Sequence, residues 1–543
     1  MYKDGMIYLG KTGEEKVYIL PKMANRHGLI AGATGTGKTT TLKVLAESFS
    51  DCGVPVFLAD AKGDLSGMCK AGSSSESLDQ RIEQFGLQEE GFQFHGYPVN
   101  YWDVYEENGL PLRTTITEMG PLLMSQILKL NATQSGVMTM LYKIADDEGL
   151  LLIDTKDLRS MIQYVGENCK EYTLKYGNVT KASLGAITRA LVALEEEGGQ
   201  MFFGEPALNV RDWISRDCDG KGTIQILDCQ KLMLNPTMYS TFMLWMMSEL
   251  YETLPEVGDC EKPKIVFFFD EAHMLFDNAS KELLTKIEQV VKLIRSKGVG
   301  IYFITQNPAD IPDGVLGQLG NKVQHALRAY TPADQKAAKA AAQSYRINDA
   351  FDTYDVLVNL GIGEALVSVL DEKGIPTVVQ KTNILPPQSQ MGPIEEEERQ
   401  SMIKESFLYA TYAEAVDRDS AYEFLNRKQV EIEAAKEKAA QEAEAAKQAE
   451  KDAKEAAKKA EKEAAAEAKR AEKEAAAAAK AEEAKKKKVK SAVSSTAKTA
   501  AGTVGREVGN TIGNTVGGKF GKKLGGNVGA ALGRGIVGTL FKL

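Results

Sequence analysis

The chain has 543 residues and a formal net charge of −9, so it is too long for one ordinary core and predicts two or three units with connecting segments. Residues 491–543 contain seven lysines and arginines and one acid, so their net charge is about +6 and that of the remaining chain is about −15. This acidic remainder argues against a protein that coats nucleic acid over its whole surface. The six cysteines lie far apart and form no C-x-x-C pair, so neither a zinc site nor a disulfide framework is indicated, and we expect reduced, structural thiols. We find neither a signal-like N-terminus nor 18 uninterrupted apolar residues, and expect a cytoplasmic protein.

The first predicted element is an N-terminal β-hairpin in residues 1–26. Two short alternating stretches, residues 6–9 and 16–20, stand on either side of a turn-forming segment at residues 10–13. The hairpin precedes the first strand of the core.

A phosphate-binding loop comes next. A short apolar run leads into Gly32-x-x-x-x-Gly37-Lys38-Thr39, and good helix formers follow. Such a loop wraps a polyanion with backbone N–H groups, while Lys38 supplies charge to the β- and γ-phosphates and the Thr39 hydroxyl binds Mg²⁺. The motif predicts a site for ATP and Mg²⁺. The residues predicted to form it are Gly32, Ala33, Thr34, Gly35, Thr36, Gly37, Lys38, Thr39 and Thr40.

Two acids follow the next apolar run, residues 54–59. Asp60 ends that run and Asp64 comes four residues later. Ligands of parallel sheets bind at the carboxyl ends of the strands, so both acids are candidates for the surroundings of Mg²⁺. The alternative is an ordinary polar exit from the strand. Residues 71–95 look loop-like, and residues 97–105 predict another strand.

Helical periodicity dominates residues 111–199 and predicts an all-helical insertion. Residues 221–228 return to a strand pattern, and residues 239–252 form a helix rich in methionine with one tryptophan. Its apolar stripe is typical of core packing rather than of a cofactor site.

The second decisive stretch is residues 264–273. Five apolar residues predict a strand buried on both faces, and Asp270 and Glu271 follow where it opens onto the ligand edge. After a phosphate loop this pattern predicts a Walker B element, in which Asp270 supports Mg²⁺ and Glu271 is the general base for the attacking water. His273 either reports the nucleotide state or is a hydrogen-bonded structural residue, the commoner case.

A helix predicted over residues 280–297 leads to another buried strand that ends in polar residues. Thr305 and Gln306 are expected near the γ-phosphate and the water, the alternative being a strand cap without chemistry. Further strands are predicted at residues 323–328, 364–370 and 376–380.

Together these motifs resemble the HerA-like branch of the HerA/FtsK ATPases. The resemblance rests on residues 27–32, 60–64, 270–273 and 305–312, and it covers roughly residues 5–390. Residues 60–67, 113–120 and 325–332 are also similar to a bacterial group of uncharacterised HerA-like proteins, DUF853.

The resemblance implies an α/β fold, a RecA-like P-loop core with a mostly parallel sheet, built from residues 27–110 and 200–390. It also implies a hexameric ring that binds double-stranded DNA, in which a neighbour's arginine reaches the ATP between subunits. Arg295 and Arg328 are the candidates, and either is alternatively a surface or ion-paired residue. Residues 1–26 are too short for the N-terminal β-barrel of HerA, which puts the same nuclease partners in doubt.

The C-terminal part, residues 391–490, predicts a long helix. From residue 430 to 488 it is almost wholly Ala, Glu, Lys and Gln, the best helix formers. Alanine rather than leucine at a would-be seam favours a solvated helix or loose bundle over a tight coiled coil.

Residues 491–543 form a basic tail with a glycine every fourth residue from Gly505 to Gly533. Such a stripe favours self-association of helices, while anionic lipid, DNA and a flexible tail remain open.

The sequence therefore predicts a Mg²⁺-dependent ATPase that resembles hexameric DNA-translocating motors and helicases. The alternative is an ATP-driven assembly or scaffold protein that engages a membrane or protein partner through its tail, without nucleic acid.

Overall fold

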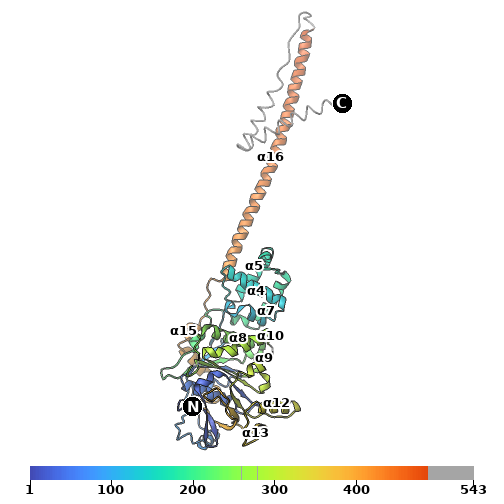
Figure 1. The fold of residues 1–543 in the computed structure, drawn as a ribbon. Coiled ribbons are helices and arrows are strands. Elements are labelled where there is room, and N and C mark those ends of the chain that lie inside the picture. The colour runs from blue at the N-terminus through green and yellow to red at the C-terminus, as the bar shows by residue number, and fades with distance from the viewer. Residues whose placement is uncertain (259, 278, 487–543) are drawn as a thin grey trace. The chain divides into compact units, whose positions relative to one another are not determined.

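The structure is a computed structural model that describes residues 1–258, 260–277 and 279–486 (Figure 1). The chain divides into two units, of which the first comprises Met1–Ala435 and the second begins at Lys436. The predicted basic tail, residues 491–543, lies outside the described residues.

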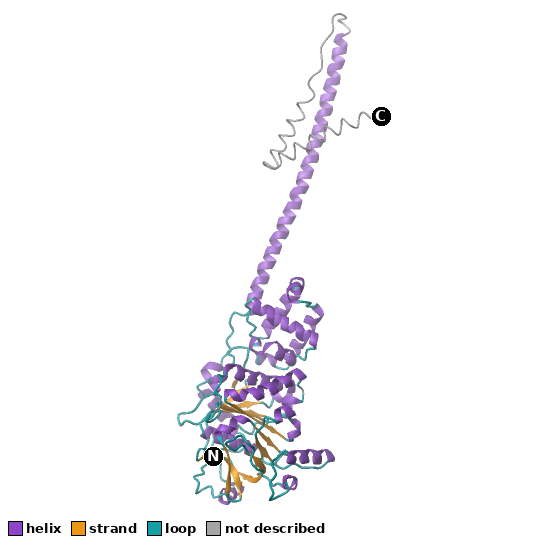
Figure 2. Cartoon of the chain, in the orientation of Figure 1, coloured by secondary structure: helices purple, strands orange, loops and turns teal. Residues whose placement is uncertain are grey.

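One mixed sheet of 13 strands organises the first unit in the described part of the chain (Figure 2). Its parallel strands are β4 (Gly28–Ala31), β5 (Val56–Asp60), β6 (Val99–Asp103), β7 (Leu110–Pro111), β8 (Ile224–Asp228), β9 (Ile265–Phe269), β10 (Val299–Thr305) and β11 (Asn321–Gln324). An antiparallel part adds β1 (Tyr2–Lys3), β2 (Met6–Thr12), β3 (Glu15–Ile19), β12 (Glu364–Ser368) and β13 (Gln380–Ile384).

The order of the strands identifies the fold. It runs β1-β2-β13-β12-β11-β4-β10-β9-β5-β8-β6-β7, with β3 paired to β2. Strand β10 therefore stands between β4, which leads into the phosphate loop, and β9, which ends before the two acids. A mostly parallel sheet with an additional strand between these two motifs confirms the predicted RecA-like P-loop class.

Helices cover both faces of this sheet. Consecutive residues of a strand point to opposite sides, and in β9 they are all apolar, so both sides need to be covered. Phe268 of β9 packs on Phe49 of α1 (Lys38–Asp51), with ring centroids 6.2 Å apart. The next residue, Phe269, stacks on Phe303, which in turn meets Phe276 of α9 (His273–Phe276). All five of these phenylalanines are buried.

The remaining helices of the core surround the sheet. They are α2 (Glu76–Gln84), α8 (Pro236–Thr253), α10 (Lys281–Ile294), α11 (Asp313–Leu316), α12 (Pro332–Gln343) and α13 (Thr353–Asn359). Helix α2 corrects the prediction of a loop over residues 71–95, since Ser75 caps it and Ile82 and Phe85 join a small buried cluster.

The predicted insertion is helical and consists of α3 (Ile116–Ile127), α4 (Ala132–Asp147), α5 (Thr155–Glu167), α6 (Cys169–Tyr176) and α7 (Lys181–Glu196). Capping boxes begin the first three of these helices, at Thr115, Asn131 and Asp154, because each side chain and its partner three residues on satisfy two helix-end N–H groups. Local sequence signals thus fix where these helices start.

Two strand predictions need correction. The strand expected at residues 376–380 is instead β13, which begins at Gln380, and β11 covers residues 321–324 rather than 323–328. In both cases the preceding or following apolar residues are buried by loop packing, as Val379 and Ala326 are.

The long helix is α16 (Ala421–Lys486), so it begins 30 residues later than the boundary predicted at residue 391. Before it, α14 (Glu396–Glu405) and α15 (Tyr409–Tyr412) pack into the core through Ile403 and Tyr412. The first turns of α16 dock on the insertion, where Tyr422 N donates to Asp157 and Lys428 pairs with Glu148 at 3.2 Å. From residue 433 to 478 every residue is exposed. None of the helices that the structure describes is both long and apolar enough to cross a bilayer.

Candidate nucleotide-hydrolysis site

The strand register brings the predicted motifs together at one edge of the sheet. Ala31 of β4 pairs in register with Thr305 of β10. Phe269 of β9 pairs in register with Phe303, which precedes Thr305 by two residues on β10. The phosphate loop, the two acids and the end of β10 therefore leave the sheet side by side, at the edge where open α/β sheets bind ligands.

The phosphate loop has glycine where a side chain would not fit. A Cβ at Gly32 would lie 2.5 Å from Cβ of His325, and a Cβ at Gly37 would lie 3.3 Å from N of Gly363. Gly35 and Gly37 also have φ of +76° and +111°, which side-chain-bearing residues rarely adopt. Thr34 and Gly35, at the tip, are exposed. This cradle fits a polyphosphate.

The lysine of the loop is buried and turned inward. Lys38 Nζ donates to the carbonyls of Gly32 at 2.6 Å and Ala33 at 3.1 Å. Burial lowers the pKa of Lys38, an effect that Glu271 and Asp270 partly offset. Its ammonium lies inside the cradle, ready to exchange carbonyl oxygens for phosphate oxygens.

Three threonines of the loop and the first helical turn differ in their contacts. The Thr36 hydroxyl donates to the carbonyl of Ala33 at 2.7 Å and closes the loop on itself. Thr39 and Thr40 are both half-buried on the first turn of α1. Because neighbours on a helix are 100° apart, these two side chains face different sides of that turn.

Asp270 and Glu271 occupy different environments although they are adjacent. Asp270 is 9% exposed, and burial raises its pKa to about 6, with Lys62 opposing. Its Oδ1 accepts a 2.9 Å bond from N of Glu271. Glu271 has a φ of +47°, an uncommon value for a residue with a side chain, and such strain clusters at functional sites.

The Glu271 carboxylate is held by three side chains. Lys62 Nζ lies 3.2 Å from its Oε1, while Gln306 Nε2 donates to its Oε2 at 3.4 Å and His273 Nδ1 lies 3.6 Å from the same oxygen. The predicted base and the predicted γ-phosphate sensor are thus brought together. His273 is placed beside the acid by this contact.

The role of Lys62 could not be predicted from the sequence. It lies 3.9 Å from Asp270 Oδ2 as well as close to Glu271. Burial acts to lower its pKa, but Asp270 and Glu271 raise it overall. The position in the segment between Asp60 and Asp64, at the carboxyl end of β5, was the only signal that could have drawn attention to it.

Asp60 organises the loop that carries Lys62. Its Oδ1 accepts from N of Lys62 at 3.2 Å and N of Gly63 at 2.8 Å, and its Oδ2 accepts from N of Leu65 at 3.0 Å. Burial raises the pKa of Asp60 to about 6. With its oxygens committed to the backbone, Asp60 fits the alternative of a strand exit better than a Mg²⁺ ligand. Asp64 is half-buried nearby and acts on Asp60 and Asp270 through its charge.

Thr305 is also structural. Its hydroxyl donates to Asp310 at 2.8 Å, and its carbonyl accepts from N of Gly32 at 3.2 Å. The strand-cap alternative therefore describes Thr305, while Gln306 is exposed and reaches Glu271.

A buried histidine supports the loop from behind and was missed from the sequence. His325 Nε2 is 2.8 Å from Oγ1 of Thr41, its Nδ1 is 3.0 Å from the carbonyl of Glu364, and its N donates to Ala31. Burial lowers the pKa of His325 to about 4, so the ring is neutral at pH 7. These contacts join residues nearly 300 positions apart.

The two candidate arginines lie at opposite edges of the sheet, and both are exposed. Arg295 comes just before β10, at its amino end, and its charge acts to lower the pKa of the buried His27. Arg328 follows β11, and its Nη1 donates to the carbonyl of Val358 at 3.2 Å. Two residues before Arg328, the carbonyl of Ala326 accepts a hydrogen bond from N of Ala33 in the phosphate loop. Neither contacts the Glu271 cluster within its own chain, so any role there needs a second subunit.

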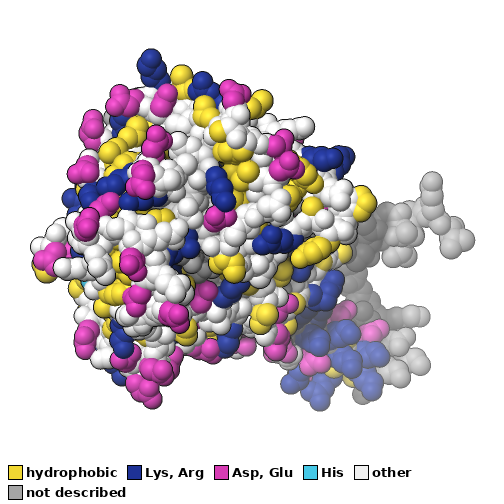
Figure 3. Space-filling view, turned by 90° about the horizontal axis from the view of Figure 1, so that it is seen from below, with side chains coloured by type: hydrophobic (Ala, Val, Ile, Leu, Met, Phe, Trp, Pro, Cys, Tyr) yellow, Lys and Arg dark blue, Asp and Glu magenta, His cyan; other side chains and the backbone are white. Residues whose placement is uncertain are grey.

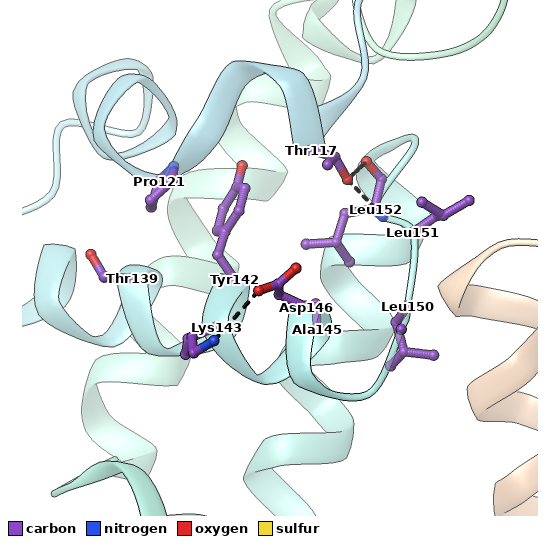
Figure 4. Close-up of a pocket in the computed structure, with 11 residues that line it drawn as sticks. Thr117, Pro121, Thr139, Tyr142, Lys143, Ala145, Asp146, Leu150, Leu151 and Leu152 are labelled. Atoms are coloured by element: carbon purple, nitrogen blue, oxygen red, sulfur yellow. Dashed lines mark hydrogen bonds and ion pairs between the residues drawn. The ribbon is translucent and has the colours of Figure 1, made fainter.

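A cavity of about 460 Å³ lies in the helical insertion, away from these residues (Figure 4). Its polar groups are paired locally: Tyr142 donates to the carbonyl of Ile116, Thr117 bonds both backbone groups of Leu152, and Lys143 pairs with Asp146. The other lining groups are mostly apolar. It offers nothing that matches a polyphosphate.

Thr39 and Asp270 are the residues predicted to bind a divalent cation. No group of three or more His, Cys, Asp or Glu residues is placed to bind a metal among the described residues. Mg²⁺ in nucleotide sites takes one or two protein oxygens and completes its shell with phosphates and water. The hydroxyl of Thr39 and the carboxylate of Asp270 supply that number.

The sheet order, the phosphate loop and the paired acids define a P-loop ATP hydrolase. The family described as "Helicase HerA-like C-terminal" matches residues 7–540. The chain belongs to this family, as the resemblance predicted.

Individual relatives are more distant. The chain is 30% identical over 122 residues to the "probable helicase MJECL08" of Methanocaldococcus jannaschii, and this match spans only 22% of either chain. Among solved structures it is similar to the plasmid coupling protein TrwB in complex with GDPNP, with 14% identity, a TM-score of 0.47, and coverage of 72% of this chain and 91% of that one. It is also similar to VirB4 of Thermoanaerobacter pseudethanolicus, with 17% identity, a TM-score of 0.46, and coverage of 71% and 97%.

Proposed function

We propose that the chain hydrolyses ATP with Mg²⁺ and that Glu271 takes the proton of the attacking water. The observation that carries this is the Glu271 carboxylate, held by Lys62 and Gln306 at the carboxyl ends of β9 and β10. A general base of this kind contributes about 10²- to 10⁴-fold to the rate. Gln306 then orients the water or senses the γ-phosphate, as in other P-loop enzymes.

The phosphates bind along the loop from Gly32 to Thr40. Lys38 places its charge at the β- and γ-phosphates, and Thr39 and Asp270 would hold Mg²⁺, which neutralises charge on the phosphate oxygens when bound. The Asp270 carboxylate binds the metal in its ionised form, and Lys62 favours that form.

We further propose that subunits assemble into a ring, with six as the expected number, that moves double-stranded DNA. Family membership and the helicase name of one relative support this proposal. On the face seen in Figure 3, acidic and basic side chains are interspersed rather than separated. Such a surface suits a DNA-binding site restricted to the interior of the assembly better than DNA binding over the outside of one subunit. A cytoplasmic location agrees with this task.

Arg295 and Arg328 are proposed to act across the subunit boundary. In a head-to-tail ring a residue that is remote from its own site reaches the neighbour's site. The test mixes Lys38→Ala subunits with Arg295→Ala or Arg328→Ala subunits. If an arginine acts in trans, some mixed interfaces combine an intact loop with an intact arginine, so activity recovers above that of either variant alone.

The motor function is tested by displacement of a third strand from double-stranded DNA by the full chain, with mass photometry of the same sample. We expect ATP-dependent displacement, lost in Glu271→Gln, together with a ring-sized species. ATP hydrolysis without DNA binding, displacement or any response to DNA would overturn the motor and favour the assembly or scaffold protein.

A further inference from the structure

Three lysines of the N-terminal strands converge on one carboxylate. The carboxylate belongs to Glu90, in the segment that follows α2. The lysines are Lys3 of β1, Lys11 of β2 and Lys16 of β3, whose Nζ atoms lie 2.9, 3.5 and 2.8 Å from the carboxylate oxygens. In the part of the chain that the structure describes, these ammonium groups form no other ion pair. The cluster therefore carries an excess of positive charge.

The strand register places like charges opposite one another. Lys11 and Lys16 are direct partners in the antiparallel pairing of β2 with β3. Like charges at such positions destabilise a sheet. The two side chains are only 13% and 28% exposed, so water screens the repulsion in part. Burial acts to raise the pKa of Glu90, but Lys16 and Lys3 lower it overall. An anion at this position thus offsets the repulsion between the lysines.

A buried hydroxyl lies beside the lysines. Tyr8 of β2 is 0% exposed, and its Oη has no hydrogen-bond partner among the described residues. Lys16 Nζ lies 5.4 Å from the centre of the Tyr8 ring, and the charge of Glu90 adds to burial in raising the pKa of Tyr8. Because a buried hydroxyl without a partner has lost its bonds to water, this group favours a ligand that brings an oxygen acceptor.

We propose that the lysine cluster, defined as Lys3, Lys11 and Lys16, binds backbone phosphates of double-stranded DNA. Glu90 competes with the phosphates for the same ammonium groups, and the Tyr8 hydroxyl donates to a phosphate oxygen. The assignment rests on the proposed function and deepens it, because it names a DNA contact on this chain.

The chemistry of the cluster suits a phosphodiester backbone. A lysine ammonium is a compact charge that contacts phosphate without reading the bases. Such contacts serve a motor that moves along DNA of any sequence. Outside its basic tail the chain carries about −15, so a local excess of positive charge is required to hold DNA there. The lysine cluster provides this excess on three neighbouring strands.

The helix that precedes Glu90 also supports the phosphate loop. Arg81 of α2 donates to the carbonyl of Gly363 at 2.6 Å. The N–H of Gly363 in turn donates to the carbonyl of Thr36, in the loop, at 3.1 Å. DNA bound at the lysine cluster therefore contacts a segment that is also bonded to the nucleotide site.

The first experiment measures binding of a fluorescent DNA duplex of mixed sequence by the full chain over a range of salt concentrations. Lys16→Gln removes one charge of the cluster and leaves Lys3 and Lys11 to pair with Glu90. Its matched control is Lys373→Gln, at an exposed lysine outside the cluster. We expect Lys16→Gln to lower the slope of log affinity against log salt by about one and Lys373→Gln to leave it unchanged.

Equal salt slopes in the two lysine variants would overturn the site. If the wild-type chain binds DNA and both variants match it, the site is wrong and the proposed motor function stands. A wild-type chain that neither binds DNA nor responds to it would overturn the proposed function as well. Vesicles of phosphatidylcholine and phosphatidylserine test a membrane as the occupant. Vesicle binding that Lys16→Gln abolishes, with DNA binding unchanged, would replace DNA by an anionic membrane surface.

A second pair of variants tests the competition. Glu90→Gln and Glu89→Gln each remove one negative charge, but Glu89 is exposed and pairs with none of the three lysines. We expect Glu90→Gln to bind DNA about three- to five-fold more tightly than Glu89→Gln, which is the range that one partly exposed ion pair contributes. Equal DNA affinity in these two variants would refute the competition between Glu90 and DNA.

Discussion

The first unit and the exposed part of α16 follow opposite rules. In the first unit, charged side chains such as Lys43 and Glu47 are buried and bonded to segments more than 300 residues away. In α16, residues 433–478 are all exposed and their ion pairs are local, as in Lys454 with Glu450. Burial restricts charges such as those of Lys43 and Glu47 to particular partners, whereas helix propensity alone accounts for the long helix.

This difference assigns the chemistry to the first unit. A site needs groups held by their surroundings in a set geometry, and an isolated exposed helix of about 1.5 Å rise per residue offers only its own surface.

The largest effect is expected for Glu271→Gln. Loss of the general base should lower steady-state ATP hydrolysis about 10²- to 10⁴-fold while ATP binding persists. The matched change Glu442→Gln, on the exposed helix, should leave hydrolysis unchanged. A Glu271→Gln protein that turns over at the wild-type rate would remove Glu271 from the mechanism.

Glu47→Ala is expected to destabilise the first unit by about 3 kcal/mol or more. It leaves the buried N–H groups of Gln388 and Ser389 without their acceptor and removes a negative charge that favours the buried Lys43 ammonium. Urea unfolding followed by tryptophan fluorescence measures this, since the unit contains all three tryptophans. For Glu444→Ala on the helix we expect a change within about 0.5 kcal/mol. Similar losses for the two variants would show that the buried Glu47 contributes no more to stability than an exposed glutamate.

Acid should weaken the first unit through His27. Its Nδ1 accepts from N of Ile301 at 3.0 Å, and burial lowers its pKa to about 4. Between the ordinary pKa of about 6.5 and pH 4 the unfolded chain binds the proton and the folded chain does not, so the free energy of unfolding falls as pH decreases through that window.

The variant His27→Asn, which suits the φ of +55° at this position, should make the decline with acid shallower. Urea midpoints at pH 7, 6, 5 and 4.5 provide the measurement. Parallel curves for the variant and the wild type would show that His27 does not carry this pH dependence.

The smallest effect on activity is expected from helix-breaking changes in α16. Substituting Ala456, Ala457 and Ala460 by glycine costs about 1 kcal/mol of helix stability per site, so far-UV circular dichroism should lose helical signal. ATP hydrolysis should stay within about two-fold of the wild type. A collapse of hydrolysis would mean that the helix supports the active site.

The sequence was sufficient to predict candidate site residues whose partners lie within the same motif. Gly32 to Thr39, Asp270 and Glu271 could be found because loop, strand and acid follow one another along the chain. The register of parallel strands then explains why Gln306 meets Glu271.

Residues that act across the fold could not be found in this way. Lys62 and His325 lie in stretches that carry the family resemblance, and Glu47 lies in no motif. The partners of all three become visible only when the strand order is known. The boundary at residue 391 failed for the same reason. Composition identified the alanine-rich stretch. It could not show that Ile403 and Tyr412 pack into the core before the long helix begins, because this packing depends on the tertiary structure.

We propose that ATP hydrolysis and its response to DNA reside in the first unit. The most direct test measures steady-state ATP hydrolysis by the full chain and by residues 1–435, each with and without double-stranded DNA at two salt concentrations. We predict stimulation by DNA in both proteins, weaker at high salt because phosphate contacts release counterions. Basal hydrolysis that DNA leaves unchanged in residues 1–435 would contradict the account.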